Sequence, residues 1–370
     1  MPKNLVLCCD GTNNQFAGDH TNVIRTYKVA RRHSGQLTYY DPGVGTMPEP
    51  WWNGRLEKRL SMLRGLIYGD GFMDNILDAY RFVVVNYEPG DNVYLFGFSR
   101  GAFTARAVAA MLHSIGLVYP ATENLLSYAQ TYWLKDYGPQ SEGGRICAEF
   151  KATLARPCPV HFIGVWDTVG SVGFFNNFRT FPHTMRNPEV AHVRHAVSID
   201  ERRSTFRQNL MVPTPTTQDV KNVYFAGVHA DVGGGYKPEE SGLAKIAFQW
   251  MMREAKNCGL DIDEIALAHE LTGTGAPPDP SAPLHKSLHG WWWLGELLPM
   301  RRYSFEDHKK HWHWLIGAFN QARNLERTAN ESYVFLHQSV LDRMRRCPDY
   351  RPKNLPPDET SVRAMFQIEN

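Results

Sequence analysis

The sequence predicts an α/β fold with a mainly parallel sheet, because short apolar strands alternate with amphipathic helices along the chain. Four apolar runs bounded by turn residues have the length and composition of buried strands: 5–9, 92–96, 160–166 and 223–228. Between the first two runs, apolar residues recur at helical spacing from Met73 to Tyr87. Parallel neighbours need long crossovers, which helices supply, so this order favours a parallel sheet.

The length and composition are sufficient for a large hydrophobic core. The chain has 370 residues, of which 43% are hydrophobic and 21% charged, and this excludes a disordered protein. Gly and Pro cluster between 273 and 283, and four prolines fall in the last 23 positions. We therefore expect an α/β domain over 1–260, a Trp- and His-rich helical cap packed on it over 261–347, and a loose tail over 348–370.

The charge balance and the hydropathy exclude several classes of protein. The formal net charge is only +2, so no overall field draws the chain to nucleic acid. No run of eighteen apolar residues predicts a spanning helix, and the apolar stretch 5–9 is too short for a signal peptide. The six cysteines match no zinc spacing. We expect reduced thiols and a cytoplasmic protein, with secretion without a signal left open.

The clearest motif is Gly97-Phe98-Ser99-Arg100-Gly101, which joins the strand 92–96 to an alanine-rich helix at 102–112. In this G-x-S-x-G pattern the chain turns sharply from strand to helix, so the positions two before and two after the serine must be small. The turn sets the serine hydroxyl at a helix N-terminus, where the backbone N–H of Arg100 can stabilise an oxyanion. The pattern predicts Ser99 as a nucleophile.

A serine nucleophile needs a base and an orienting carboxylate, and both appear later at strand ends. Asp167 ends the strand 160–166, and His229 follows the strand 223–228 and enters a glycine-rich loop. Open α/β sheets place functional groups at these carboxyl ends. Asp200 and Asp231 are the alternative orienting acids, although Asp231 is expected to hold the glycine-rich loop in place.

A second oxyanion donor is expected from the loop Asp10-Gly11-Thr12 after the first strand. The backbone N–H of Gly11 or Thr12 has the right position at a strand end. An Asx turn capped by Asp10 explains the same residues equally well.

Longer strings around these residues resemble a known family. They are LCCDGTNN, YYDPGVGT, NYEPGDNVYLFGFSRGAFTAR, FIGVWDTVGSVG, HAVSIDERRSTF, VYFAGVHADVGGGY and, more weakly, FLHQSV. The chain resembles the α/β-hydrolase domain family, formerly of unknown function, that is linked to type VI secretion phospholipase effectors of the first lipase family. The resemblance implies an α/β-hydrolase fold, esterase chemistry on phospholipid acyl chains, Ser99 as nucleophile, Asp167 as acid and His229 as base.

Two weaker signals lie in the C-terminal region. Five of the ten tryptophans fall within 24 positions, which fits either a lid that contacts lipid or ordinary packing of a cap: Trp291, Trp292, Trp293, Trp312 and Trp314. His308, His311 and His313 match no standard ligand set, so we expect a solvated helix and no metal site there. Arg106 is expected to be a buried ion-pair partner.

The leading hypothesis from the sequence is a serine hydrolase that cleaves carboxylic esters of phospholipids or related acyl lipids, with no cofactor. Its partners would be the lipid substrate and, transiently, a membrane surface, with no nucleic acid; the sequence does not define an oligomeric state. The alternatives are an esterase or thioesterase for small soluble acyl compounds, and a catalytically silent scaffold.

Overall fold

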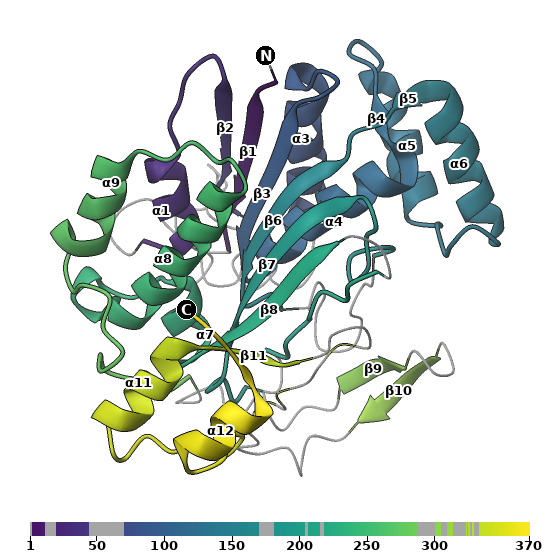
Figure 1. The fold of residues 1–370 in the computed structure, drawn as a ribbon. Helices are drawn as coiled ribbons and strands as arrows, with labels where there is room; N and C mark the ends of the chain where they lie inside the picture. The colour runs from purple at the N-terminus through teal and green to yellow at the C-terminus, as the bar shows by residue number, and fades with distance from the viewer. Residues whose placement is uncertain are drawn as a thin grey trace, which may run out of the picture.

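The computed structural model describes residues 2–11, 20–43, 70–169, 181–203, 206–214, 218–287, 300–304, 309–313, 323, 325, 328 and 333–370. Its centre is an eight-stranded sheet in the order β12-β11-β8-β7-β6-β3-β1-β2, flanked by helices (Figure 1). Every pair of neighbouring strands in this sheet runs parallel. The predicted α/β fold class is confirmed.

The four strands predicted from the sequence are all present, and four more complete the sheet. The strands are β1 (Asn4–Cys9), β2 (Gln36–Asp41), β3 (Asn92–Phe98), β6 (Val160–Trp166), β7 (Val190–Ser198), β8 (Asp219–Phe225), β11 (Phe335–His337) and β12 (Gln367–Glu369). The sequence did not reveal β7 because Arg194 and His195 interrupt its apolar run, yet both side chains are buried. Two short pairs lie apart from the main sheet, β4 (Leu117–Val118) with β5 (Ala155–Arg156), and β9 (Met300–Ser304) with β10 (Lys309–His313).

The helices cover both faces of the sheet because successive strand residues point to opposite sides. On one face Leu5, Leu7 and Cys9 belong to a core shared with α3 (Asp70–Asn86), α4 (Arg100–Ile115), α5 (Leu126–Trp133) and α6 (Glu142–Leu154). On the other, Val6 and Cys8 share a core with α1 (Asn22–Val29) and α8 (Gly242–Asn257). The remaining helical segments are η1 (Glu123–Leu125), α7 (His229–Gly233), η2 (Pro238–Glu240), α9 (Glu264–Ala268), η3 (His269–Gly273), α11 (Gln338–Arg346) and α12 (Glu359–Met365).

The C-terminal stretch 348–370 is not a loose tail, contrary to the expectation from its prolines. It forms α12 and then β12, which pairs with β11 and so extends the central sheet beyond β8 (Figure 1). Val362 and Phe366 are buried in a third core cluster with Val197 and Tyr224 of the sheet. The prolines precede α12 and do not interrupt it. The division into a domain over 1–260 and separate C-terminal parts therefore does not describe the sheet, to which both ends of the chain contribute.

The predicted cap over 261–347 is only partly helical: α9, η3 and α11 lie within it, but the described residues between 300 and 313 form strands. Residues 300–304 and 309–313 pair as the antiparallel strands β9 and β10, with Arg302 opposite His311. Trp312, His311 and His313 therefore lie in a strand and not in the predicted helix. His308, Trp314 and the tryptophans at 291–293 lie outside the described residues.

Candidate active site

The predicted nucleophile lies in a strained turn between β3 and α4. Ser99 has φ 57° and ψ −118°, in the left-handed half of backbone space that a non-glycine residue seldom adopts, at a cost of about 1–3 kcal/mol. A Cβ atom at Gly97 would collide with the backbone of Gly101 and Ala102, and one at Gly101 with the backbone of Cys9 and Asp10. The two glycines of the motif thus allow the turn to lie against the end of β1.

The first oxyanion donor predicted from the sequence is available. Helix α4 begins at Arg100, so the Arg100 N–H has no acceptor within the helix, and none of the other described residues accepts a hydrogen bond from it. The Arg100 side chain is partly buried, and burial lowers its pKa to about 10. No carboxylate of the described residues forms an ion pair with it.

Asp10 holds the loop after β1 by a contact with the next residue, one residue short of the reach of an Asx turn. The Gly11 N–H donates to Oδ1 of Asp10 at 2.7 Å, while Thr21 Oγ1 and the Tyr40 hydroxyl donate to Oδ2 at 2.6 and 2.9 Å. Asp10 is therefore a buried carboxylate that organises its own loop. Gly11 can act as an oxyanion donor only by giving up this hydrogen bond. Thr12 lies outside the described residues.

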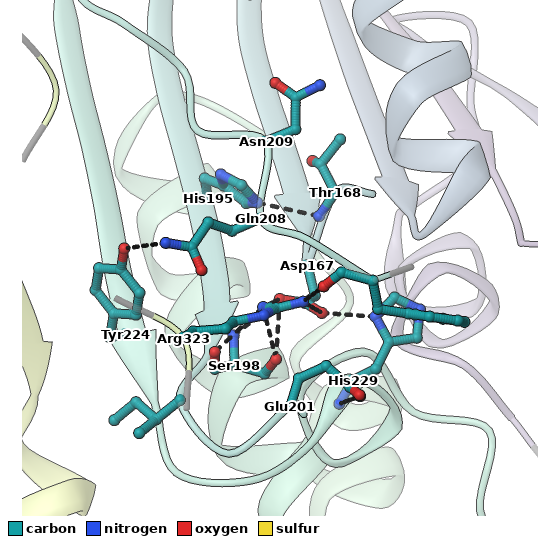
Figure 2. A network of polar contacts seen from close by, with 12 residues as sticks. Asp167, Thr168, His195, Ser198, Glu201, Gln208, Asn209, Tyr224, His229 and Arg323 are labelled. Atoms are coloured by element: carbon teal, nitrogen blue, oxygen red, sulfur yellow. Dashed lines mark hydrogen bonds and ion pairs between the residues drawn. The ribbon is translucent and has the colours of Figure 1, made fainter. Parts of the chain in front are cut away.

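Asp167 and His229 come together although 62 positions separate them in the sequence. His229 Nδ1 lies 2.6 Å from Oδ2 of Asp167, and both residues are buried (Figure 2). Asp167 directly follows β6 and has φ 39°, while His229 begins α7, which follows β8. The two side chains meet because the carboxyl ends of parallel strands lie at one edge of the sheet.

The imidazole of His229 also lies beside the turn that carries the serine. Its ring centroid is 4.6 Å from that of Phe98, the residue before Ser99, and 4.8 Å from that of Phe206. The hydroxyl of Ser99 makes no hydrogen bond within the described part of the chain, so a proton transfer from Ser99 to His229 remains a prediction. Catalytic hydrogen bonds are often long before substrate binds.

The two alternative orienting acids bind other partners. Asp200 accepts hydrogen bonds from the Gly227 N–H at 2.7 Å and from the Tyr350 hydroxyl at 2.8 Å. Asp231 accepts from the Val228 N–H and binds His285 Nδ1 at 2.6 Å. Each carboxylate therefore supports the backbone just before His229, and Asp231 holds its loop as predicted.

Reasoning from sequence missed the remaining partners of Asp167. Arg323 donates from Nη1 to Oδ1 at 2.5 Å and from Nη2 to Oδ2 at 3.1 Å, and the Ser198 N–H donates to Oδ1 at 2.9 Å (Figure 2). Burial by itself would raise the pKa of Asp167, but the guanidinium of Arg323 and the hydrogen bond from His229 outweigh it and hold the pKa well below its usual range. No motif in the sequence marks Arg323.

Glu201 holds the backbone of the histidine, and sequence reasoning did not single it out either. The His229 N–H donates to Oε2 of Glu201 at 3.2 Å, and Arg203 forms an ion pair with the same carboxylate at 2.9 Å. Burial opposes ionisation, but the hydrogen bond and charge of Arg203 prevail and lower the pKa of Glu201 to about 2. Glu201 lies within the string 195–206 that carried part of the family resemblance.

Arg106 differs from its prediction as a buried ion-pair partner. Its guanidinium donates to the backbone carbonyls of Thr184 and Asn209 and to the Asn209 side chain, and no described carboxylate pairs with it. Burial lowers its pKa to about 9. Carbonyl oxygens satisfy this arginine in place of a counter-ion, and no spacing rule in a sequence distinguishes the two cases.

Two searches over the described residues bear on metals and membranes. They contain no group of three or more His, Cys, Asp or Glu placed to hold a metal ion. None of their helices combines the length and apolarity needed to cross a bilayer.

Ser99, Asp167 and His229 lie within the part of the chain that a family model matches. A family model described as the catalytic domain of Tle1-like phospholipase effectors of type VI secretion matches residues 3–254. The chain belongs to this family. Membership in this Tle1-like family agrees with the resemblance found in the sequence.

The relatives differ in how much they share with this Tle1-like chain. An uncharacterized protein of Saccharomyces cerevisiae is 37% identical over 227 residues, which cover 58% of this chain and 33% of the yeast protein. An uncharacterized protein from Pseudomonas aeruginosa has a TM-score of 0.44 at 19% identity over 75% of this chain and 52% of its own. The Tle1 effector bound to the VgrG spike has a TM-score of 0.37 at 19% identity over 66% and 53%. The chain thus spans about a third of the yeast relative and about half of the two structures, and the structural similarities are too low to bear on function.

Proposed function

We propose that this protein is a serine hydrolase that cleaves carboxylic esters of phospholipids or related acyl lipids. The observation that carries the proposal is the buried hydrogen bond of 2.6 Å between Asp167 and His229, at the edge of the sheet where Ser99 occupies a strained turn. Three side chains from distant parts of the chain have the order and the strand-end positions that α/β-hydrolases use for this chemistry.

The proposed mechanism begins with the tautomer of His229. An Nδ1–H donated to the Asp167 carboxylate leaves Nε2 without a proton, so Nε2 can accept the proton of the Ser99 hydroxyl. The serine oxygen then attacks the ester carbonyl carbon, and the Arg100 N–H binds the resulting oxyanion. A second donor comes from Thr12 or from a rearranged Gly11.

The intermediate then collapses in two stages. His229 returns its proton to the leaving alcohol as the ester C–O bond breaks, which leaves an acyl group on Ser99. A water molecule loses a proton to His229 and attacks this acyl group, releasing the fatty acid and restoring the serine. The reaction consumes one ester and one water and needs no cofactor.

Two observations favour a phospholipid over a neutral ester. The family is one of phospholipase effectors. In addition, the residue after the nucleophile carries a guanidinium with no carboxylate partner among the described residues, and a guanidinium binds phosphate oxygens well. Because such a substrate lies in a bilayer, the proposal includes transient contact with a membrane surface.

The test is a substrate panel with the wild type and Ser99→Ala. The panel contains vesicles of phosphatidylglycerol, vesicles of phosphatidylcholine, p-nitrophenyl butyrate and a short acyl thioester. We expect fatty-acid release from at least one type of vesicle, and a loss of about 10³-fold or more in Ser99→Ala, with an unchanged circular dichroism spectrum.

The other outcomes separate the alternatives. Turnover of p-nitrophenyl butyrate or of the thioester, without turnover of either type of vesicle, would identify an esterase for soluble substrates. Equal turnover by wild type and Ser99→Ala would overturn the assignment of the nucleophile. Absence of turnover on the whole panel, by a folded protein that still binds vesicles, would support the silent scaffold.

A further inference from the structure

The carboxylate of Asp167 is held on two sides, and only one side belongs to the predicted Ser-His-Asp set. His229 binds one oxygen, whereas the guanidinium of Arg323 reaches both oxygens from the opposite side (Figure 2). Two N–H groups in a fixed plane define the orientation of a carboxylate far better than a single contact does. The plane of the Asp167 carboxylate is thus set by Arg323.

Arg323 is itself held by several partners. Its Nη1 donates to the hydroxyl of Ser198 at 2.8 Å, and its Nη2 donates to the carbonyl of Phe206, whose ring packs against His229. Asn354 fixes the backbone, since its amide donates to the Arg323 carbonyl at 2.9 Å and to the Ile199 carbonyl at 3.2 Å. With 8% of its surface exposed, the arginine is part of the site's interior.

The position of Arg323 in the chain makes this contact informative. The family match ends at residue 254, so the arginine comes from the C-terminal region that completes the sheet with β11 and β12. The arginine that holds Asp167, the acid of the proposed catalytic set, therefore lies outside the matched domain.

The charged groups around the Asp167–His229 pair determine what Arg323 contributes. Glu201 faces His229 from its backbone side and is neutralised by Arg203. On the other side, burial lowers the pKa of His195 to about 3, so that imidazole is uncharged at neutral pH. Within the described residues, Arg323 is the cation in direct contact with the Asp167 carboxylate.

We propose that Arg323 is a positioning residue for the hydrolysis, acting through Asp167: it fixes the plane of the carboxylate and offsets part of its charge, so that His229 is correctly oriented and gives up its proton readily. This inference rests on the proposed function. Without the guanidinium, the full charge of Asp167 would stabilise protonated His229, and the carboxylate would be free to rotate.

The kinetic test measures pH–rate profiles of wild type, Arg323→Met and Arg323→Lys on the best substrate of the panel. Arg323→Met should lower kcat about 10²-fold with little change in KM, because misplacement of a catalytic group costs about that much. The pH at which activity falls to half on the acid side should rise by about half a unit or more. Arg323→Lys keeps the charge without the paired contact. Its activity should fall to half at the same acid pH as the wild type, and its kcat should lie between those of the wild type and Arg323→Met.

A matched control separates positioning from stability. Arg194 is a buried arginine of β7 that binds Glu254 at 2.6 Å, away from the strand end that carries the site. Arg194→Met should lower the melting temperature and leave the pH–rate profile in place. In the Asp167→Asn background, Arg323→Met should cause little further loss of activity, because the group through which it acts has been changed.

A second readout does not depend on turnover. Proton NMR should show a downfield signal from His229 Nδ1–H, assigned by its loss in His229→Ala, and this signal should shift and broaden in Arg323→Met. If the wild type hydrolyses nothing, the proposed function fails while this signal still tests Arg323. The inference is overturned if Arg323→Met leaves the proton signal unchanged, or leaves the acid limb and kcat at their wild-type values. If Arg323→Met does not fold, the same measurements on Arg323→Lys decide, and a kcat equal to that of the wild type then overturns it.

Discussion

Asp167 and Asp41 are both buried carboxylates at the carboxyl ends of strands in one sheet, yet their environments give them opposite properties. Asp167, at the end of β6, is bound by Arg323 and His229, and its pKa lies well below the usual range. Asp41, at the end of β2, accepts hydrogen bonds from the Gly43 N–H at 2.8 Å and from the Asn75 amide at 2.9 Å, and burial raises its pKa to about 6. Burial thus acts alike on both, and the nearby cation decides the outcome.

The comparison shows how the surroundings of two buried carboxylates in one sheet set their charge. A buried carboxylate beside an imidazole stays ionised more readily when a counter-charge is added to its hydrogen bonds. At the end of the edge strand β2, Asp41 binds neutral donors, the Gly43 N–H and the Asn75 amide. The following variants test this difference, from the largest expected effect to the smallest.

The largest effect is expected from Asp167→Asn. The substitution keeps the shape but removes the charge that holds the Nδ1–H tautomer of His229, so kcat should fall about 10⁴-fold. Steady-state kinetics on the substrate identified by the panel measure this loss. Asp200→Asn is the matched control, since Asp200 binds Gly227 and Tyr350 and should retain most of the activity. A larger loss in Asp200→Asn than in Asp167→Asn would reverse the assignment.

A smaller effect is expected for Glu201→Gln in the pH dependence of stability. The pKa of Glu201 is lowered from 4.5 to about 2, so its contribution is present above about pH 4.5 and is lost as the pH falls toward 2. Between about pH 6 and pH 3 the wild type should lose on the order of 2 kcal/mol more stability than Glu201→Gln. Urea unfolding at the two pH values measures the difference. An equal change in the free energy of unfolding for both proteins would show that folding does not lower the pKa of Glu201.

An effect of similar size, with the opposite sign, is expected for Asp41→Asn. The pKa of Asp41 is raised from 3.8 to about 6, so its contribution is full below about pH 3.8 and is lost as the pH rises through 6. Relative to the wild type, Asp41→Asn should gain on the order of 2 kcal/mol between about pH 4 and pH 7.5. Melting temperatures across this range provide the check. A gain toward acid pH would mean that Asp41 and Asp167 titrate alike, and the comparison would fail.

The sequence predicted the parts of the site that depend on local pattern. Ser99, Asp167 and His229 each follow an apolar strand, and strand ends converge for geometric reasons, so their positions could be inferred without coordinates. The steric demands of the turn predicted that backbone atoms pack closely against Gly97 and Gly101, and the structure shows these close contacts. The four most apolar strands were found for the same reason.

The parts that the sequence did not predict depend on contacts between distant segments. Arg323 lies 156 positions from Asp167 and belongs to no motif, so only the fold brings them together. Strand β12 has the short sequence Gln-Ile-Glu after a proline-rich stretch, and its pairing with β11 gives it its conformation. Gly11 illustrates a further limit, because the sequence allowed either an oxyanion donor or an Asx turn, whereas the structure binds the Gly11 N–H to the side chain of the residue just before it, Asp10.

Labelling with a fluorophosphonate, followed by peptide mass spectrometry, tests most directly whether Ser99, His229 and Asp167 act together. The reagent reacts only with a serine that an adjacent base has activated. The account predicts a single adduct on the peptide containing Ser99, formed rapidly in the wild type and at least about 10³-fold more slowly in His229→Ala. An adduct on another serine, or equal labelling of Ser99 with and without the imidazole, would contradict it.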